Sequence, residues 1–484
     1  MLLSICFLIC VCLGGSRAAS PVTPAVETKS GPVVGFVKQY NGQDILHFYG
    51  IPYAEPPVGS LRFKKPVEKR SWTKVLEAFK PGPACIQAKT SVKDVHLEMS
   101  EDCLYLNIIE TKDSLSDRKA KKRPVMVFIH GGSFRYGSGA AFPYLSDVFV
   151  QSQDIILVTI NYRLNIFGFL YHEKVPEFIG NQGLWDQNMA FRWVKEHIEA
   201  FGGDPEDITI FGQSAGSISC SHHLVSPHSP GLFKKAILQS GVGLLLQDKS
   251  NLRVTLATEI VLNRTGCAYA GDKLKCLQSI DPMKLEYSLP TRFLAFSPIY
   301  ENEFIPVSES RYLLDDNPVQ DVDVMVGITR YDASVYYVRL VPRVFAEENL
   351  SYQDGLEIIS ISYKKEAVPE IAKVYFDEPT SDGIRSGLIL MFTDIFFGCG
   401  TFEFAKRYSK KQKKGNVFTY ILNHRPLTSH RPICTLDRDF GVCHEDDLIF
   451  MFGAPFMSKL KYSDADRELS AQMMDIWGTF AHKG

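Results

Sequence analysis

The 484-residue sequence has no dominant charge, no internal repeat and no low-complexity segment. Its 53 lysines and arginines nearly balance 55 aspartates and glutamates, which gives a formal net charge of -2. Because neither sign dominates, the composition argues against a general affinity for nucleic acid or for an anionic membrane. The one basic cluster, Arg118 to Arg123, is expected to be a solvated loop before a strand.

Long apolar runs are also missing, except at the N-terminus. Residues 2–13 are apolar apart from Ser4, and small residues follow up to Ala19. This pattern is typical of a secretory signal peptide and is too short for an ordinary membrane span. We expect residues 1–19 to be the signal peptide and residues 20–484 to form one secreted, extracellular domain without a later span.

Cysteine usage agrees with export. Of 11 cysteines, three lie in the N-terminal apolar stretch, which leaves eight. An even number in an exported chain favours disulfides, although the number does not give their pairing. Cys220 is expected to be a buried free thiol. Short separations favour the pairs Cys85 with Cys103, Cys267 with Cys276, and Cys434 with Cys443. Two sequons, at Asn263 and Asn349, predict glycosylation.

Short apolar runs alternate with helical patterns along the chain. A helix is predicted at 184–201, and strands at 33–37, 45–51, 103–109, 124–129, 155–162, 208–211, 234–238, 323–328 and 417–422. Such alternation predicts an α/β fold with a mostly parallel, doubly wound central sheet and helices on both faces. In that class, residues at the carboxyl ends of the strands meet at one edge and build the site.

A glycine-flanked serine lies where a predicted strand meets a predicted helix. Ser214 stands between Gly212 and Gly216, after a β-branched run. In a nucleophile elbow the turn strains the serine backbone and lifts its Oγ above the sheet, and both flanking positions must be small. Ser214 is therefore the candidate nucleophile. An ordinary glycine-serine turn is the alternative, because the motif is short.

A glycine pair supplies a candidate oxyanion hole. Gly131 and Gly132 follow the apolar strand 124–129 directly. Backbone N–H groups of consecutive glycines can point at one position, where, with the N–H of Ala215, they would stabilise the negative oxygen of a tetrahedral intermediate. A tight turn that needs a positive φ is the alternative.

The base and the acid are sought downstream of the serine. Among 12 histidines, His444 stands in a loop before an apolar run, whereas its competitor His424 is followed by Arg-Pro and suggests a structural turn. Asp332 follows the strand 323–328 and lies between serine and histidine in chain order, as this fold requires. It would orient the imidazole and stabilise the imidazolium. Other loop carboxylates remain alternatives, and we expect neither a metal nor a cofactor.

Together these segments resemble the type-B carboxylesterases and cholinesterases of the α/β-hydrolase fold, over nearly the whole mature chain. The matching segments are 48–57, 100–107, 130–134, 181–187, 201–205, 212–216 and 441–448. The resemblance implies a serine esterase with Ser214, His444 and the same oxyanion donors, and it implies the first two cysteine pairs. Because family members usually continue further, it also implies that the chain is incomplete at its C-terminus.

Three departures from the family pattern bear on the substrate. The acid is usually glutamate, where this chain has Asp332, and the residue before the serine is usually glutamate, where it has Gln213. The region before Ser100 lacks the aromatic residue on which cholinesterases stack a cation. Cation recognition needs such a π face and benefits from negative charge. Neutral esters are therefore the expected small-molecule partners. Leu294 and Phe296 match the acyl-pocket segment, with plain core as the alternative.

Other functions remain open within the resemblance. The Gly-Gln-Ser-Ala-Gly motif at 212–216 and Asp186-Gln187 are similar to those of juvenile hormone esterases, which makes hormone hydrolysis an alternative. A cholinesterase-like enzyme is a second alternative. A third is a non-catalytic binding protein, since neuroligin-like relatives use this fold after losing the serine. The presence of Ser214 and His444 argues against the third.

Overall fold

A large mixed sheet forms the centre of the protein. The computed structural model describes residues 21–88, 98–245, 250–290, 295–315, 317–336, 341, 349–429, 434 and 440–484. Within these ranges the sheet has nine strands: β3 (Phe36–Tyr40), β4 (Gln43–Pro52), β8 (Tyr105–Thr111), β9 (Arg123–Ile129), β10 (Ile156–Ile160), β11 (Gly203–Gln213), β12 (Lys235–Gln239), β13 (Asp323–Thr329) and β14 (Val417–Leu422). Their order is β14-β13-β12-β11-β9-β10-β8-β4-β3.

The strands from β14 to β10 in this order run parallel to one another. The strands β8, β4 and β3 extend the sheet with antiparallel pairs at the other edge. Parallel strands are normally covered on both faces, and all seven residues of β9 are buried. The predicted mostly parallel α/β fold is therefore confirmed.

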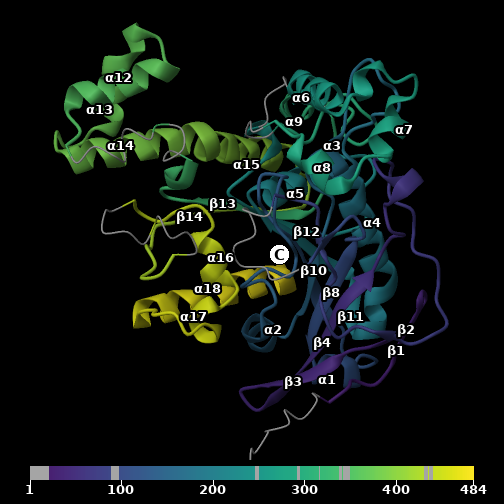
Figure 1. Ribbon diagram of the computed structural model, residues 1–484. Coiled ribbons are helices and arrows are strands. Elements are labelled where there is room, and N and C mark those ends of the chain that lie inside the picture. The colour runs from purple at the N-terminus through teal and green to yellow at the C-terminus, as the bar shows by residue number, and fades with distance from the viewer. Residues whose placement is uncertain are drawn as a thin grey trace, which may run out of the picture.

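Helices cover both faces of the sheet (Figure 1). One face packs against α1 (Lys112–Ser116), α3 (Asn165–Phe169), α4 (Gln182–His197), α5 (Ala215–Val225) and α15 (Cys399–Lys411). The other packs against α2 (Asp147–Gln153), α16 (Asp446–Met451) and α18 (Asp464–Lys483). Neighbouring strand residues point to opposite faces. Val127 of β9 thus belongs to the first core, and Phe128 packs with Phe452 and Trp477 in the second.

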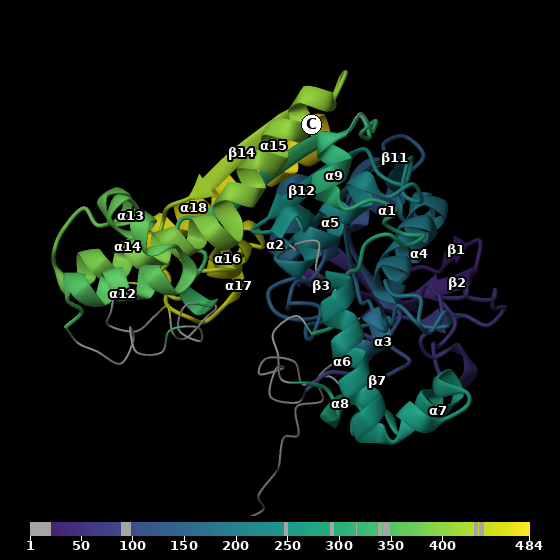
Figure 2. The same cartoon turned by 90° about the horizontal axis from the view of Figure 1, so that it is seen from above.

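A helical lobe stands away from the sheet on the side of β14 (Figures 1 and 2). It consists of α12 (Tyr352–Ser362), α13 (Val368–Tyr375) and α14 (Ser381–Thr393), which share a separate hydrophobic core. A π-helical turn, η7 (Asp394–Gly398), joins α14 to α15. By length and composition alone, the continuous helix Ser381–Lys411 passes as a membrane span, which the sequence did not lead us to expect; 56% of its most apolar window is buried.

Smaller elements complete the described chain. The remaining helices are α6 (Ser250–Thr265), α7 (Lys273–Gln278), α8 (Pro282–Tyr287), α9 (Glu309–Leu314) and α17 (Ala454–Met457). The remaining strands are β1 (Val26–Thr28), β2 (Gly31–Val34), β5 (Leu76–Glu77), β6 (Ala84–Cys85) and β7 (Met99–Ser100). Short 3-10 turns are η1 (Gly59–Leu61), η3 (Ile198–Phe201), η4 (Gly243–Leu245), η5 (Cys267–Tyr269) and η6 (Lys365–Ala367).

Several predicted boundaries differ from the structure: β11 begins at Gly203 rather than at 208, and β8 spans Tyr105–Thr111 rather than 103–109. The strand predicted at 33–37 is split at Gly35 between β2 and β3, which belong to different sheets. A Cβ at Gly35 would lie 2.1 Å from the carbonyl oxygen of His47, so the chain passes too close there for a larger residue. The helix predicted at 184–201 begins two residues earlier, and its last turn is the 3-10 turn η3.

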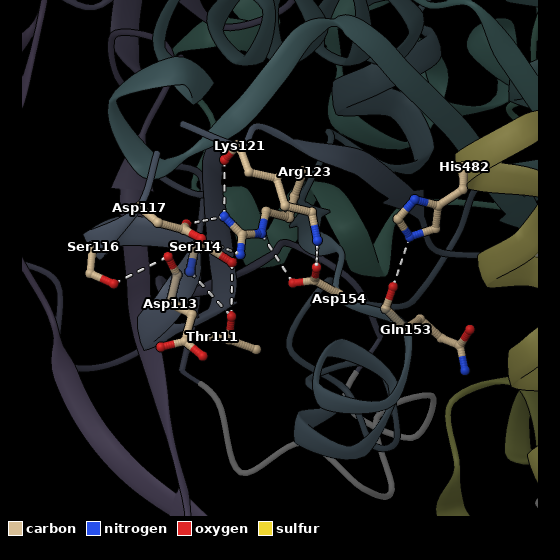
Figure 3. Close-up of polar contacts among 10 residues, drawn as sticks. All are labelled: Thr111, Asp113, Ser114, Ser116, Asp117, Lys121, Arg123, Gln153, Asp154 and His482. Atoms are coloured by element: carbon tan, nitrogen blue, oxygen red, sulfur yellow. Dashed lines mark hydrogen bonds and ion pairs between the residues drawn. The ribbon is translucent and has the colours of Figure 1, made fainter. Parts of the chain in front are cut away.

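The prediction of a solvated loop at the basic cluster is wrong for Arg123. This residue begins β9 and is only 3% exposed. Its guanidinium pairs with Asp117 and, at 3.1 Å, with Asp154 (Figure 3). Lys121 also pairs with Asp154 but remains exposed. These carboxylates compensate the buried charge of Arg123. The ion pairs with Asp154 also connect the loop before β9 to the end of α2.

The last helix, α18, is hydrogen-bonded to the end of α2 and to the start of β12. The Nε2 of His482, in α18, lies 2.8 Å from the backbone carbonyl oxygen of Gln153, at the end of α2 (Figure 3). A second tie comes from the Nζ of Lys235 at the start of β12, which donates to the carbonyl oxygen of Ala481 at 2.7 Å. These contacts hold α18 across the sheet.

The predicted cysteine pairs are present. Disulfides join Cys85 with Cys103, Cys267 with Cys276, and Cys434 with Cys443. Cys220 is a buried free thiol, as expected, and Cys399 is free and exposed. The third disulfide ends one residue before His444, so it anchors the loop that carries this histidine.

A buried acid lies behind α5. Glu309 of α9 is fully buried, and its Oε2 accepts a hydrogen bond from the Oγ of Ser221 at 3.3 Å. The same oxygen lies 3.9 Å from the Nδ1 of His222, which α5 contains. Burial raises the pKa of Glu309 to about 8 and lowers the pKa of His222 to about 3. Both groups are therefore predominantly uncharged at neutral pH.

Replacement of this acid should change how stability depends on pH. In the unfolded chain the carboxyl ionises near its usual pKa of 4.5, whereas in the folded protein it keeps its proton up to about pH 8. The contribution of Glu309 to wild-type stability therefore falls as the pH rises through this window, by up to about 1.4 kcal/mol for each pH unit. Glu309→Gln has no carboxyl at this position and so lacks this loss. In urea unfolding, the free energy of unfolding of Glu309→Gln minus that of wild type should therefore be more positive at pH 8 than at pH 5.

The matched control is Glu357→Gln, which changes an exposed acid on α12. This control should leave the pH dependence as it is in wild type. A stability difference between Glu309→Gln and wild type that is the same at both pH values would contradict a raised pKa at Glu309.

Candidate active site

Ser214 occupies a strained junction between β11 and α5. Its φ of 57° and ψ of -121° lie in a region that non-glycine residues rarely adopt. A Cβ at Gly212 would lie 2.5 Å from the backbone of Gly216, and one at Gly216 would lie 2.0 Å from the carbonyl oxygen of Ile129. Both flanking positions thus require glycine, as a nucleophile elbow does.

The glycine loop after β9 passes directly beside this serine. A Cβ at Gly131 would lie 3.2 Å from the Cβ of Ser214, and Gly132 has a φ of +106°. Ala215 is the first residue of α5, where backbone N–H groups have no partner within the helix. These two sources of N–H groups flank the serine, so the arrangement can stabilise a negative oxygen formed there.

Asp332 and His444 form a buried pair. The Oδ1 of Asp332 accepts a hydrogen bond from the Nδ1 of His444, and its Oδ2 accepts one from the backbone N–H of Thr329 at 3.0 Å. Asp332 is fully buried and His444 is 1% exposed. A carboxylate at Nδ1 fixes the tautomer and leaves Nε2 of the neutral ring as an acceptor.

Two loops hold this pair in register. The backbone N–H of Tyr331 donates to the carbonyl oxygen of Val442 at 3.1 Å, and the Oγ of Ser334 donates to that of Phe440 at 2.8 Å. The loop after β13 is thereby joined to the loop that carries His444. The competitor His424 instead lies 2.8 Å from Asp466, in the structural role that the sequence suggested.

Three side chains surround the outer part of the imidazole. The Nε2 of His444 lies 3.1 Å from the Nε2 of Gln213 and 3.3 Å from the Oη of Tyr336. The rings of Tyr336 and Phe397 lie 5.2 and 5.0 Å from the imidazole. Within the described part of the chain, no hydrogen bond joins the Oγ of Ser214 to His444. Gln213 Oε1 is buried and has no partner there either.

A second carboxylate lies behind the pair. Asp447, in the first turn of α16, is fully buried, and its Oδ2 accepts hydrogen bonds from Gln239 at 2.8 Å and Tyr420 at 3.1 Å. Burial raises the pKa of Asp447 to about 6, and the negative charge of Asp332 acts in the same direction. The site therefore holds one carboxylate against the histidine and a second one that is readily protonated.

Other predicted residues have different surroundings. Phe296 is fully buried in the core on the α5 face of the sheet, and Leu294 lies outside the described residues. The two sequon residues, Asn263 and Asn349, are exposed. Within the described ranges, no group of three or more His, Cys, Asp or Glu side chains is arranged to hold a metal ion.

Sequence reasoning missed three neighbours of the histidine. Asp447 belongs to the same motif as His444, so its position three residues later was a usable signal. Tyr336 follows Asp332 by four residues, and this spacing alone did not suggest contact with the base. Phe397 lies in a π-helical turn more than 40 residues upstream, for which the sequence carries no evident signal.

Loss of the Asp332 charge should slow the reaction strongly. Asp332→Asn keeps the shape of the side chain but no longer favours the tautomer with a proton on Nδ1. We expect kcat/KM for a p-nitrophenyl ester to fall by roughly 10⁴-fold, as in Ser-His-Asp enzymes. Asp447→Asn, which changes the other buried carboxylate, should cost less than about tenfold. A loss of less than about tenfold in Asp332→Asn would show that another group orients His444.

Comparison with known proteins agrees with this geometry. The sequence profile of the carboxylesterase family matches residues 22–484. An acetylcholinesterase of Bungarus fasciatus is 31% identical, with 100% of this chain and 81% of the relative aligned, and a cholinesterase of Mus musculus is 31% identical over 99% and 81%. Acetylcholinesterase 4 of Caenorhabditis briggsae is 30% identical over 98% and 83%. The chain thus belongs to the carboxylesterase family and is a carboxylic ester hydrolase of the α/β-hydrolase fold.

Proposed function

We propose that the protein is a secreted serine esterase that hydrolyses neutral carboxylic esters. In this proposal Ser214 is the nucleophile, His444 the general base and Asp332 the group that orients it. The observation that carries the proposal is the buried Asp332–His444 hydrogen bond next to a serine in a strained elbow. Ser214, Asp332 and His444 lie in loops that follow the carboxyl ends of β11, β13 and β14, respectively.

The proposed reaction has two halves. The Oγ of Ser214 attacks the ester carbonyl carbon while the Nε2 of His444 takes its proton, and the N–H groups of Gly131, Gly132 and Ala215 hold the resulting oxyanion. The intermediate collapses to an acyl-enzyme as His444 returns the proton to the leaving alcohol. Water then attacks the acyl group with His444 as base, and the carboxylic acid and free Ser214 are released.

The preference for neutral substrates rests on Gln213. This residue is fully buried beside the serine and within 3.1 Å of the base, so a carboxylate there would act directly on any bound cation. An amide supplies no such charge. Residues 89–97, which include the region without an aromatic residue, lie outside the described residues. Leu294 and Phe296 remain the proposed lining of the acyl side, and a juvenile hormone ester remains an alternative substrate.

Export is supported by the covalent structure. Three disulfides within the described ranges are typical of proteins that fold in an oxidising compartment. We propose that residues 1–19 are a cleaved signal peptide, that residues 20–484 form a single domain, and that Asn263 and Asn349 carry glycans. Exposure of both asparagines is compatible with modification.

A pair of isosteric substrates tests this proposal. Acetylcholine and 3,3-dimethylbutyl acetate have the same shape and differ in the charge of the alcohol group. We expect kcat/KM for the neutral ester to equal or exceed that for acetylcholine, because no charge at position 213 favours the cation. Gln213→Glu should shift the ratio towards acetylcholine, and Ser214→Ala should hydrolyse neither ester. A tenfold or greater preference of the wild type for acetylcholine would contradict the proposal.

The same assay separates the hormone alternative. A long-chain conjugated methyl ester, similar to a juvenile hormone, is added as a third substrate. A kcat/KM for this ester far above that for short acyl esters would favour a hormone esterase.

A further inference from the structure

The imidazole of His444 faces a hydroxyl other than that of the candidate nucleophile. The Oη of Tyr336 lies 3.3 Å from its Nε2, the nitrogen that must take the proton of Ser214. Tyr336 and Asp332 both belong to the segment after β13. One short segment therefore contacts the imidazole at both of its nitrogens.

The hydrogen bond from Nδ1 to Asp332 determines that Nε2 of the neutral ring is a hydrogen-bond acceptor. Because Asp332 accepts the Nδ1 proton, Nε2 of the neutral ring carries one lone pair. The amide N–H of Gln213 and the hydroxyl of Tyr336 both lie within reach of this lone pair. No hydrogen bond from Ser214 to it exists in the described part of the chain. The nucleophile must therefore compete for the nitrogen that activates it.

We propose that Tyr336 is a positioning residue whose hydroxyl donates to the Nε2 of His444 in the free enzyme and gives this nitrogen up to the Oγ of Ser214 when an ester binds. This inference rests on the proposed function, because it requires Ser214 and His444 to react as stated above. The exchange breaks one hydrogen bond to Nε2 and forms another, and it moves no proton by itself.

Two consequences distinguish this role from simple packing. A hydrogen bond that is present in the free enzyme and lost in the transition state lowers kcat/KM. A donor to Nε2 also stabilises the neutral ring relative to the imidazolium, whose Nε2 carries a proton and cannot accept a hydrogen bond. The groups that face His444 are Asp332 and Tyr336 after β13, Asp447 on α16, and the uncharged Gln213 at the end of β11. Tyr336→Phe alters only one of them.

The ring of Tyr336 can stay in place when the hydroxyl is removed. It lies 5.7 Å from the ring of Phe397 and 5.2 Å from the imidazole, and phenylalanine retains both contacts. A matched control is Tyr375→Phe in α13, which removes a hydroxyl that donates to Asp394 at 2.7 Å. This control loses a comparable hydrogen bond in the same half of the protein without touching His444.

The experiment measures kcat/KM for p-nitrophenyl acetate from pH 5 to pH 9 in the full chain. In Tyr336→Phe, the value on the high-pH plateau should rise by roughly two- to tenfold, the size expected from one neutral hydrogen bond. The acid limb of the profile should also move to higher pH. Tyr375→Phe should match the wild type in both respects.

The proposed role of Tyr336 requires both the higher plateau and the shifted acid limb in Tyr336→Phe. An unchanged or lower plateau, or an acid limb that does not move, would overturn the inference, since the hydroxyl would then not compete for Nε2. Stoichiometric reaction of a fluorophosphonate with Ser214 in the wild type keeps the two proposals separate. If Ser214 reacts and Tyr336→Phe behaves as wild type, only the role of Tyr336 is wrong. If Ser214 does not react, the proposed function is wrong.

Discussion

The buried hydrogen bond between Asp332 and His444 is the constraint on which the candidate site depends. It joins two loops that are 112 residues apart in the sequence. Burial of an ionised carboxylate away from water costs free energy unless the group is paired and hydrogen-bonded. Asp332 meets this condition through His444 and the backbone N–H of Thr329. The backbone and hydroxyl contacts between the same two loops, together with the disulfide at Cys443, keep the pair in place.

The central sheet explains how such distant residues meet. β9, β11, β13 and β14 are parallel members of one sheet, so their carboxyl ends lie along one edge. The glycine loop follows β9, the serine follows β11, the acid follows β13, and the histidine lies in the connection after β14. Helices on both faces bury the strands, and α5 and α16 begin at the site itself. The fold thus supplies rigid supports, while the chemistry belongs to the loops.

Much of this arrangement could be predicted from sequence because its signals are local or ordered. Apolar runs indicated the buried strands, and glycines at 212 and 216 indicated a turn that admits no Cβ. The required chain order then selected Asp332 and His444. Features that depend on distant partners escaped prediction. Arg123 is buried where Asp154, from another element, compensates its charge, and the strand at 33–37 is split between two sheets at Gly35, where the chain passes close to His47.

The surroundings of Nε2 were the least predictable part of the site. Gln213 was singled out for its missing charge, but its contact with His444 depends on how the loops pack. Tyr336 and Phe397 reach the imidazole through the segment after β13 and through a π-helical turn, respectively. Relatives at 31% identity align with nearly the whole chain and belong to the same family, and they do not determine which ester this site accepts.

The central claim is that Ser214 is the activated nucleophile of this site. Mass spectrometry of the intact, fluorophosphonate-treated protein, followed by peptide mapping, tests it most directly. The account predicts one equivalent of label, carried by the peptide that contains Ser214. Label on another serine, or no label in a folded protein, would contradict the account.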